Sequence, residues 1–167
     1  RGPDDPFAGA VLVNLGNRVG ALSDLQVAGL GADVAAMTDA QVGALSASQV
    51  RSLSGLQLNA LGASQVQSLD ITELQNRQVA ALDMTKVGDT QVTALTASQI
   101  RSLTTTPIQA LSNTQAGAIS TANAPELSLS QIAQFTAAQL GAFAPAALAA
   151  LTADQKDVLA STLSSTD

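Results

Sequence analysis

The sequence is built from an eight-residue unit, [S/T]-x-x-Q-[V/I]-x-x-L, which we call an octad and which recurs through most of the chain. Full copies begin at Ser23, Thr38, Ser46 and Thr96, and copies with another apolar residue at one or both of the Val/Ile and Leu positions begin at Ser128 and Thr136. Self-similarity at a fixed short period is typical of proteins whose repeats cannot fold alone and pack on their neighbours. The octads therefore predict a solenoid over residues 11–159 rather than a domain with one central core.

Some repeats depart from eight residues in a regular way. Two thirteen-residue variants, 70–82 and 83–95, align without gaps, and in each an octad follows a pentad of the form Asp-x-Thr-x-[L/V]. The segments 16–22 and 31–37 are similar to an octad that lacks one position. Pro and Gly in residues 1–10 predict an extended N-terminal segment, and we expect residues 160–167 to be a C-terminal tail.

Each octad contains a signal for the start of a helix. In a capping box, a Ser or Thr hydroxyl accepts from the backbone N–H three residues later, and the Gln at that position accepts from the N–H of the cap. Apolar residues before the cap and after the Gln form a hydrophobic staple. The predicted boxes are Ser23 and Gln26, Thr38 and Gln41, Ser46 and Gln49, Ser54 and Gln57, Thr96 and Gln99, Ser112 and Gln115, Ser128 and Gln131, Thr136 and Gln139, and Thr152 and Gln155.

These signals predict an all-α fold of short capped helices that restart in every octad. One continuous helix is the first alternative, but eight residues advance about 80° beyond two full turns, so its apolar stripe would spiral around the rod. A β-solenoid is the second alternative, but the apolar positions do not alternate as they do in strands. Because one octad buries too little apolar surface to offset the entropy of ordering it, the octads must stack.

The same pattern assigns the core of the predicted solenoid. The Val or Ile and the Leu of each octad form two buried columns, and small residues between them let neighbouring coils approach closely. Phe7, Phe135 and Phe143 are expected to fill space in this core. Lys156 stands where the other octads carry Val or Ile, so the last octad is either a capping repeat or a docking surface for another chain.

Composition excludes several functions. The chain has no Cys, His, Trp or Tyr, which removes the usual ligands of zinc, haem and iron–sulfur clusters and the commonest general base. We therefore expect no cofactor and no catalytic site. A net charge of −6 argues against a nucleic-acid partner. No apolar run approaches the roughly 18 residues that span a bilayer, so we expect no membrane insertion.

Two pairs of charged residues occupy equivalent places and need an explanation. Asp70 and Asp83 begin the two thirteen-residue variants, where they are either helix caps or ligands of a calcium ion. Arg51 and Arg101 share one octad position within the similar segments 38–69 and 88–119. They form either a solvated face or a strip that recognises a partner.

The run L-[S/T]-x-x-Q-[V/I]-x-x-L over residues 16–159 resembles repeat tracts in large secreted or surface-exposed bacterial proteins, including adhesin-like ones. That resemblance implies an extracellular or cell-surface location and a structural or adhesive role. The chain begins at Arg1 without an initiator Met, so we also expect it to be processed from a longer precursor.

These observations lead to two hypotheses. The first is a non-enzymatic structural protein that serves as a stalk, a spacer or a fibre subunit, and whose partner is a second copy stacked end to end or a longer array of the same repeat. The second is a solenoid adhesin or scaffold module that binds a protein or a glycan on one face. The second hypothesis requires an exposed strip of aromatic or Arg side chains, and the sequence offers few of them.

Overall fold

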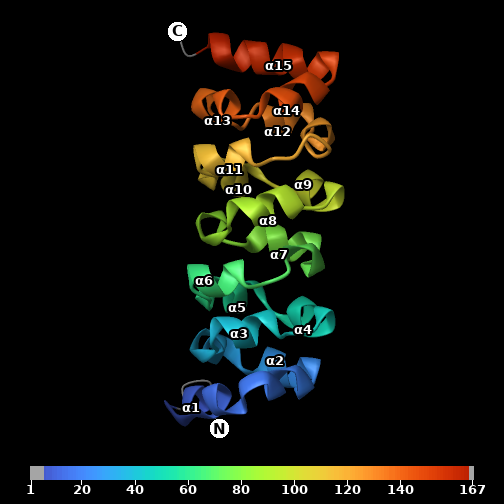
Figure 1. Ribbon diagram of the computed structural model, residues 1–167. Helices are drawn as coiled ribbons and strands as arrows, with labels where there is room; N and C mark the ends of the chain where they lie inside the picture. The colour runs from blue at the N-terminus through green and yellow to red at the C-terminus, as the bar shows by residue number, and fades with distance from the viewer. Residues whose placement is uncertain (1–5, 166–167) are drawn as a thin grey trace. The chain divides into compact units, whose positions relative to one another are not determined.

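The structure is a computed structural model, and it describes residues 6–165 of the chain. Within this range the chain forms fifteen α-helices and five 3-10 helices (η), and no strand (Figure 1). The predicted all-α class with many short, repeated helices is confirmed. A single solenoid over residues 11–159 stays a prediction.

The chain divides into two compact units, Arg1–Leu82 and Asp83–Asp167. This boundary lies between the two thirteen-residue repeats that the sequence shows. The helices of the first unit are α1 (Pro6–Leu15), η1 (Gly16–Ala21), α2 (Asp24–Gly29), η2 (Gly31–Ala36), α3 (Asp39–Gly43), α4 (Ala47–Ser52), α5 (Gly55–Ala60), α6 (Ala63–Gln67), η3 (Ile71–Glu73) and α7 (Asn76–Ala81). Those of the second unit are η4 (Met84–Lys86), α8 (Asp89–Ala94), α9 (Ala97–Ser102), α10 (Thr105–Ala110), α11 (Asn113–Gly117), η5 (Ala124–Glu126), α12 (Leu129–Ile132), α13 (Ala137–Gly141), α14 (Pro145–Ala150) and α15 (Ala153–Ser164).

The helices are short because two extended residues interrupt the chain in most octads. Helix α4 shows the pattern: its C-cap Leu53 has ψ 131° and the next N-cap, Ser54, has ψ 163°. A Ser or Thr cap offers its hydroxyl to the first turn of the next helix, which makes the extended conformation favourable at that position. The octad is therefore one short helix followed by a corner.

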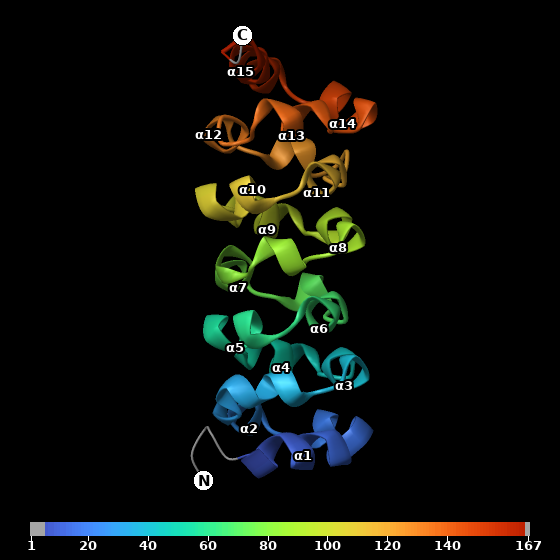
Figure 2. The same ribbon diagram turned by 90° about the vertical axis from the view of Figure 1, so that its left-hand side faces the viewer.

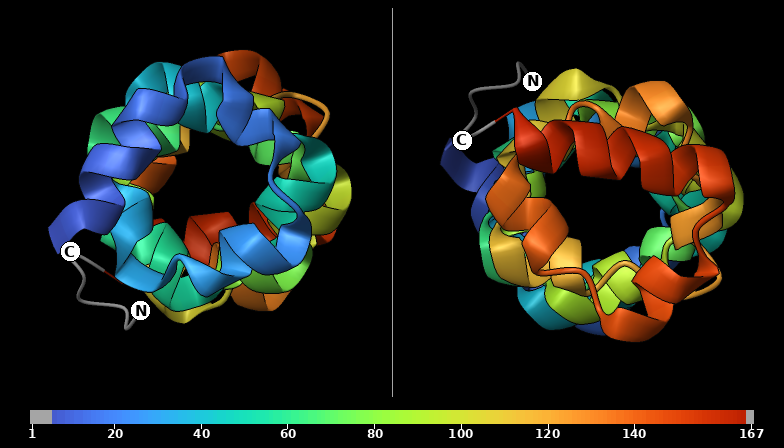
Figure 3. Two further views of the ribbon diagram at one scale, coloured as in Figure 1. Left: turned by 90° about the horizontal axis from the view of Figure 1, so that it is seen from below. Right: turned by 90° about the horizontal axis from the view of Figure 1, so that it is seen from above.

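Within each unit the helices follow a coil, and helices about three repeats apart lie against each other. In the first unit, α3 contacts α6 and α2 contacts α4, as Figure 2 shows for α3 and α6. In the second unit, α11 contacts α13 and α12 contacts α15. The end views in Figure 3 show the helices of each unit arranged around the axis of its coil.

The two predicted core columns are buried. Val50 and Leu53 of one octad are 2% and 3% exposed, and Ile100 and Leu103 of another are 0% and 4% exposed. Phe135 and Phe143 also lie in the core, with ring centroids 5.4 Å apart in an edge-to-face arrangement. The third predicted core aromatic, Phe7, has a side chain outside the described part of the chain.

The seven-residue repeats form 3-10 helices, which are wound more tightly than α-helices. Gly16 and Gly31 begin them with φ of 52° and 54°, the left-handed region that glycine adopts without steric cost. At these two sites a glycine corner replaces the Ser or Thr cap, which accounts for the missing residue.

Both predicted ends of the repeat region need correction. Residues 6–10 are helical rather than extended, since α1 begins at Pro6 and proline is well tolerated in the first turn of a helix. At the other end α15 continues to Ser164, so residues 160–164 are not a tail. No Gly or Pro follows Leu159 to stop that helix. Residues 1–5 and 166–167 lie outside the described range.

Candidate functional site

The most regular polar feature of the structure is the Gln at the fourth position of the octads, and we call this set the glutamine column. At all nine predicted boxes the Ser or Thr hydroxyl accepts from the backbone N–H of the Gln, and the Gln side chain accepts from the N–H of the cap. For Thr136 and Gln139 these two distances are 3.2 Å and 2.8 Å. The box thus uses the Oε1 atom of each Gln and leaves its Nε2 free to donate elsewhere.

The Nε2 atom forms hydrogen bonds from one turn of the coil to the preceding turn. Gln139 Nε2 donates to the carbonyl oxygens of Ile108 at 3.0 Å and Leu111 at 2.8 Å. Gln49 Nε2 does the same to carbonyls 30 and 27 residues earlier. The side chains do not bond to one another as a ladder, because each amide reaches a backbone carbonyl.

The separation between donor and acceptor fixes the size of a coil turn. The described amides of the glutamine column reach carbonyls 25 to 31 residues earlier in the chain. One turn of the coil therefore takes between three and four octads. The glutamines that make these bonds are buried, from 1% exposed at Gln49 to 8% at Gln65 and Gln131, whereas Gln26 is exposed.

The inter-turn bonds satisfy groups that burial would otherwise penalise. A buried amide or carbonyl without a partner costs about 1–3 kcal/mol. Among the described residues, no buried side-chain nitrogen or oxygen lacks a hydrogen-bond partner. The glutamine column therefore stabilises both the helix starts and the stacking of turns, whereas the sequence predicted only the first of these roles.

Sequence reasoning missed Asn123, and it also missed three glutamines whose N-cap is not Ser or Thr: Gln65 after Gly62, Gln78 after Gln75, and Gln91 after Gly88. Asn123 is 5% exposed, and its Nδ2 donates to the carbonyl oxygen of Leu95, 28 residues earlier, at 2.5 Å. No Ser or Thr stands three residues before a Gln in this segment, so no capping box marks it. The local signal is Ser120, three residues earlier, whose hydroxyl accepts from the backbone N–H of Asn123 at 3.1 Å.

Within the described residues no turn packs before the first coil turn, and the residues of that turn at the Gln position form what we call the N-terminal face. This face consists of Val11, Arg18, Gln26 and Asp33, each directly before a buried Leu or Val. Val11 is 52% exposed, and Arg18 and Gln26 are exposed as well. Gln26 Oε1 accepts from the cap at 2.8 Å, but within the described chain no acceptor meets its Nε2. Among the described residues, the Arg18 guanidinium and the Gln26 Nε2 therefore have no hydrogen-bond acceptor.

The last helices of the second unit present carbonyl oxygens without donors among the described residues. We call the side that carries Gly141, Phe143 and Leu151 the C-terminal face. No donor within residues 6–165 reaches the carbonyl oxygens of Phe143 or Leu151. At the same octad position, the carbonyl oxygens of Leu103 and Leu111 accept from Gln131 and Gln139. A Cβ built on Gly141 meets no atom of the described residues within 4 Å. The C-terminal face therefore presents unused acceptors.

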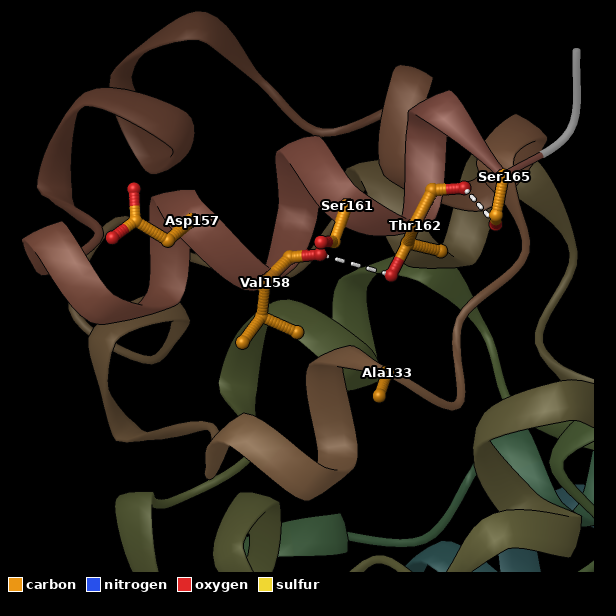
Figure 4. Close-up of a pocket in the computed structure, with 6 residues that line it drawn as sticks. All are labelled: Ala133, Asp157, Val158, Ser161, Thr162 and Ser165. Carbon is orange, nitrogen blue, oxygen red and sulfur yellow. Dashed lines mark hydrogen bonds between the residues drawn. The ribbon is translucent and has the colours of Figure 1, made fainter.

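A groove of about 380 Å³ lies at the edge of the C-terminal face. It is formed by α15 and by Ala133, which follows α12, and Figure 4 shows Asp157, Val158 and Thr162 of α15 along it. Asp157 is exposed, whereas Val158 and Thr162 are partly buried. The groove combines an apolar wall with an acidic rim.

Lys156 occupies a core position of the last octad but is exposed, and its Nζ donates to the carbonyl oxygen of Ala149 at 3.3 Å. Helix α15 packs on α12 and α13. The part of the C-terminal face near α15 thus carries Lys156, and the Phe143 and Leu151 side chains are buried at 4% and 5% exposed.

The two Asp-x-Thr pentads are helix caps. Asp83 Oδ1 accepts from the backbone N–H of Thr85 at 3.0 Å and from its hydroxyl at 2.6 Å, and Asp70 does the same with Thr72. Each Asp begins a 3-10 helix. Within the described range no three His, Cys, Asp or Glu residues gather as metal ligands would. This geometry supports the cap interpretation over the calcium interpretation.

The hydrogen bond from the Thr85 hydroxyl, followed by that from the Thr85 N–H, lowers the pKa of Asp83 below its ordinary value of 3.8. As the pH falls, the Asp83 carboxylate is therefore protonated at a higher pH in the unfolded chain than in the folded chain. The stabilisation that Asp83 provides is complete above pH 3.8 and is lost as the pH falls through the lower pKa of the folded state.

We expect Asp83→Asn to weaken the acid sensitivity of the fold, because Asn keeps the acceptor oxygen and removes the titration. Between pH 5 and pH 3 the urea midpoint of the wild type should fall further than that of the variant. The difference should be below about 1 kcal/mol, since the carboxylate is partly exposed. If the urea midpoints of the two proteins fell equally between pH 5 and pH 3, the charged form of Asp83 would not contribute to stability.

The two equivalent arginines are held in ion pairs with carboxylates 22 and 25 residues later in the chain, in the next turn of the coil. Arg51 binds the carboxylate of Glu73, and its Nε donates to the Glu73 carbonyl oxygen at 3.2 Å. Arg101 lies 2.7 Å from the carboxylate of Glu126. These pairs favour the solvated-face interpretation, in which neither guanidinium is available as a free recognition group.

No protein-family model matches the sequence, and searches of curated proteins and of solved structures found no match. Of the helices in the described range, none is both long enough and apolar enough to cross a bilayer.

Proposed function

We propose that the chain is a non-enzymatic structural repeat protein that acts outside a bacterial cell as a stalk, a spacer or the subunit of a self-assembling fibre. The observation that carries the proposal is the glutamine column. Apart from the exposed Gln26, its amides are buried, and those of residues such as Gln139 bond to the preceding turn, so they serve the shape of the coil and are not available to a ligand. The extracellular location rests on the resemblance to secreted repeat tracts.

The distribution of the other reactive groups supports the same proposal. The described aromatic side chains, Phe135 and Phe143, are 2% and 4% exposed. Arg51 and Arg101 are engaged with carboxylates. The strip of free aromatic or Arg side chains that an adhesive face requires is therefore not assembled from these residues, which favours the structural role over the adhesin role.

The solution dimensions of the purified chain test this proposal. A globular protein of 167 residues has a radius of gyration of about 15 Å. If turns of the coil stack throughout the chain, small-angle X-ray scattering on the monomeric fraction should give a clearly larger radius and an elongated distance distribution. A radius near 15 Å would contradict both the stalk and the spacer.

A further inference from the structure

We propose that a groove in the first unit binds the carboxylate of a small organic acid, with the Arg77 guanidinium as its main donor. The groove has a volume of about 400 Å³, which is within the range of small-molecule sites. It is lined by residues 52–55, at the corner between α4 and α5, and by Arg77 and Gln78 of α7. The groove belongs to the middle of the chain rather than to either end, and the inference goes beyond the structural function without depending on it.

Polar pairs join helices of successive coil turns elsewhere in the first unit. Helix α4 contacts α2, and Ser48 Oγ donates to the carboxylate of Asp24. Helix α6 contacts α3, and Ser64 Oγ donates to the carboxylate of Asp39 at 3.1 Å. In both pairs the donor is the second residue after an N-cap, and the carboxylate belongs to the first residue after the N-cap of the earlier helix. We call these two places the donor position and the carboxylate position.

The contact between α5 and α7 has a donor but no carboxylate. Figure 2 shows these two helices on the same side of the coil, and they contact each other. Arg77 holds the donor position of α7, and Gly55 holds the carboxylate position of α5. Because glycine has no side chain, the groove opens between the two residues. A carboxylate from another molecule would complete the arrangement that Asp24 and Asp39 complete within the chain.

The donors of the groove are available to a ligand. Arg77 is exposed, and within residues 6–165 its guanidinium makes no hydrogen bond or ion pair. The Glu73 carboxylate, four residues earlier, is already paired with Arg51. A guanidinium binds a carboxylate through two parallel N–H donors. The Ser54 hydroxyl accepts from the Gln57 backbone N–H at 3.1 Å, so its own proton can be donated to the same ligand.

The charge of the groove favours a carboxylate over a phosphate. Of the described residues that line it, Arg77 alone is cationic, and none is acidic. One guanidinium balances the single negative charge of a carboxylate, whereas a phosphate group carries about −1.5 to −2 at pH 7. The chain has a net charge of −6, so the excess charge of a phosphate would be repelled. The ligand class is therefore a singly charged organic acid.

NMR titration of the full 15N-labelled chain tests this site, with sodium acetate as the probe and sodium chloride adjusted to keep the ionic strength constant. We expect the backbone N–H of Gly55 and the Nε–H of Arg77 to shift and to saturate. Arg77→Gln should weaken acetate binding at least about tenfold, because it removes the charged donor pair. Arg18→Gln is the matched control, since it removes the same charge from another exposed arginine without a described partner. It should bind acetate as the wild type does. A wild type without saturable shifts, or an Arg77→Gln variant that binds like the wild type, would overturn the proposal.

Gly55→Asp tests the same site by supplying the carboxylate from the chain itself. The new side chain would stand at the carboxylate position opposite Arg77, as Asp24 stands opposite Ser48. A Cβ fits at Gly55, because the nearest atom, the Cβ of Ala81, lies 3.4 Å away. We expect this variant to keep the far-UV circular dichroism of the wild type and to bind acetate at least about tenfold more weakly. Acetate binding as tight as that of the wild type would overturn the site. Inorganic phosphate that bound more tightly than acetate would overturn its assignment to carboxylates.

Discussion

Gln139→Ala should lower the free energy of unfolding by about 2–4 kcal/mol, because one substitution removes three hydrogen bonds. The cap bond contributes about 1 kcal/mol. The carbonyls of Ile108 and Leu111 also lose the donor that meets them inside the structure, at about 1 kcal/mol or more each. Urea denaturation followed by far-UV circular dichroism measures the change.

Two further substitutions separate these contributions. Gln109→Ala removes an exposed amide from α10 and should change the stability by less than about 0.5 kcal/mol. Gln139→Glu keeps the oxygen that accepts from Thr136 but turns a negative carboxylate toward two carbonyl oxygens. Its stability should be low at pH 7 and should approach that of the wild type as the pH falls and the new group becomes protonated. If Gln139→Ala cost no more than a lost cap, the inter-turn bond would be unimportant.

The second large effect concerns the closest approach between turns. Gly117→Ala should destabilise the fold by about 1–3 kcal/mol, because the new Cβ would lie 2.6 Å from the Ala142 carbonyl oxygen, and the backbone must move to relieve the overlap. Thermal unfolding compared with the wild type measures the loss.

Gly141→Ala is the matched control for this change. Both glycines are the last residue of a five-residue helix and hold the same octad position. A Cβ at Gly141 meets nothing, so alanine should instead stabilise its helix by about 0.5–1 kcal/mol. We expect the two substitutions to change the stability in opposite directions. Equal changes would mean that helix propensity alone, and not the contact between turns, determines the effect.

The predicted parts of the fold are those encoded within one octad. A Ser cap and its Gln lie three residues apart, so the box around Ser46 and Gln49 can be read from local sequence. The Val and Leu columns follow from the same short spacing. The Asp-x-Thr pentads also act locally, through bonds between Asp83 and Thr85.

The missed parts depend on contacts one coil turn away. The Nε2 of Gln139 serves carbonyls 28 and 31 residues earlier, and the local sequence does not show how many octads complete a turn. Asn123 was missed because Asn stands there in place of the Gln of the motif, although Ser120 holds the cap position. The two end faces are defined by the absence of a neighbouring turn within the described chain, so they become visible only when the inter-turn bonds are known.

The limited reach of these bonds also bears on how the chain folds. Since each described amide of the column pairs with a carbonyl at most 31 residues behind it, a helix needs only the segment synthesised just before it. Contacts of such short range favour rapid folding, and repeat proteins grow outward from an ordered neighbour. A nascent chain can therefore add turns in order as it emerges from the ribosome or from a secretion channel.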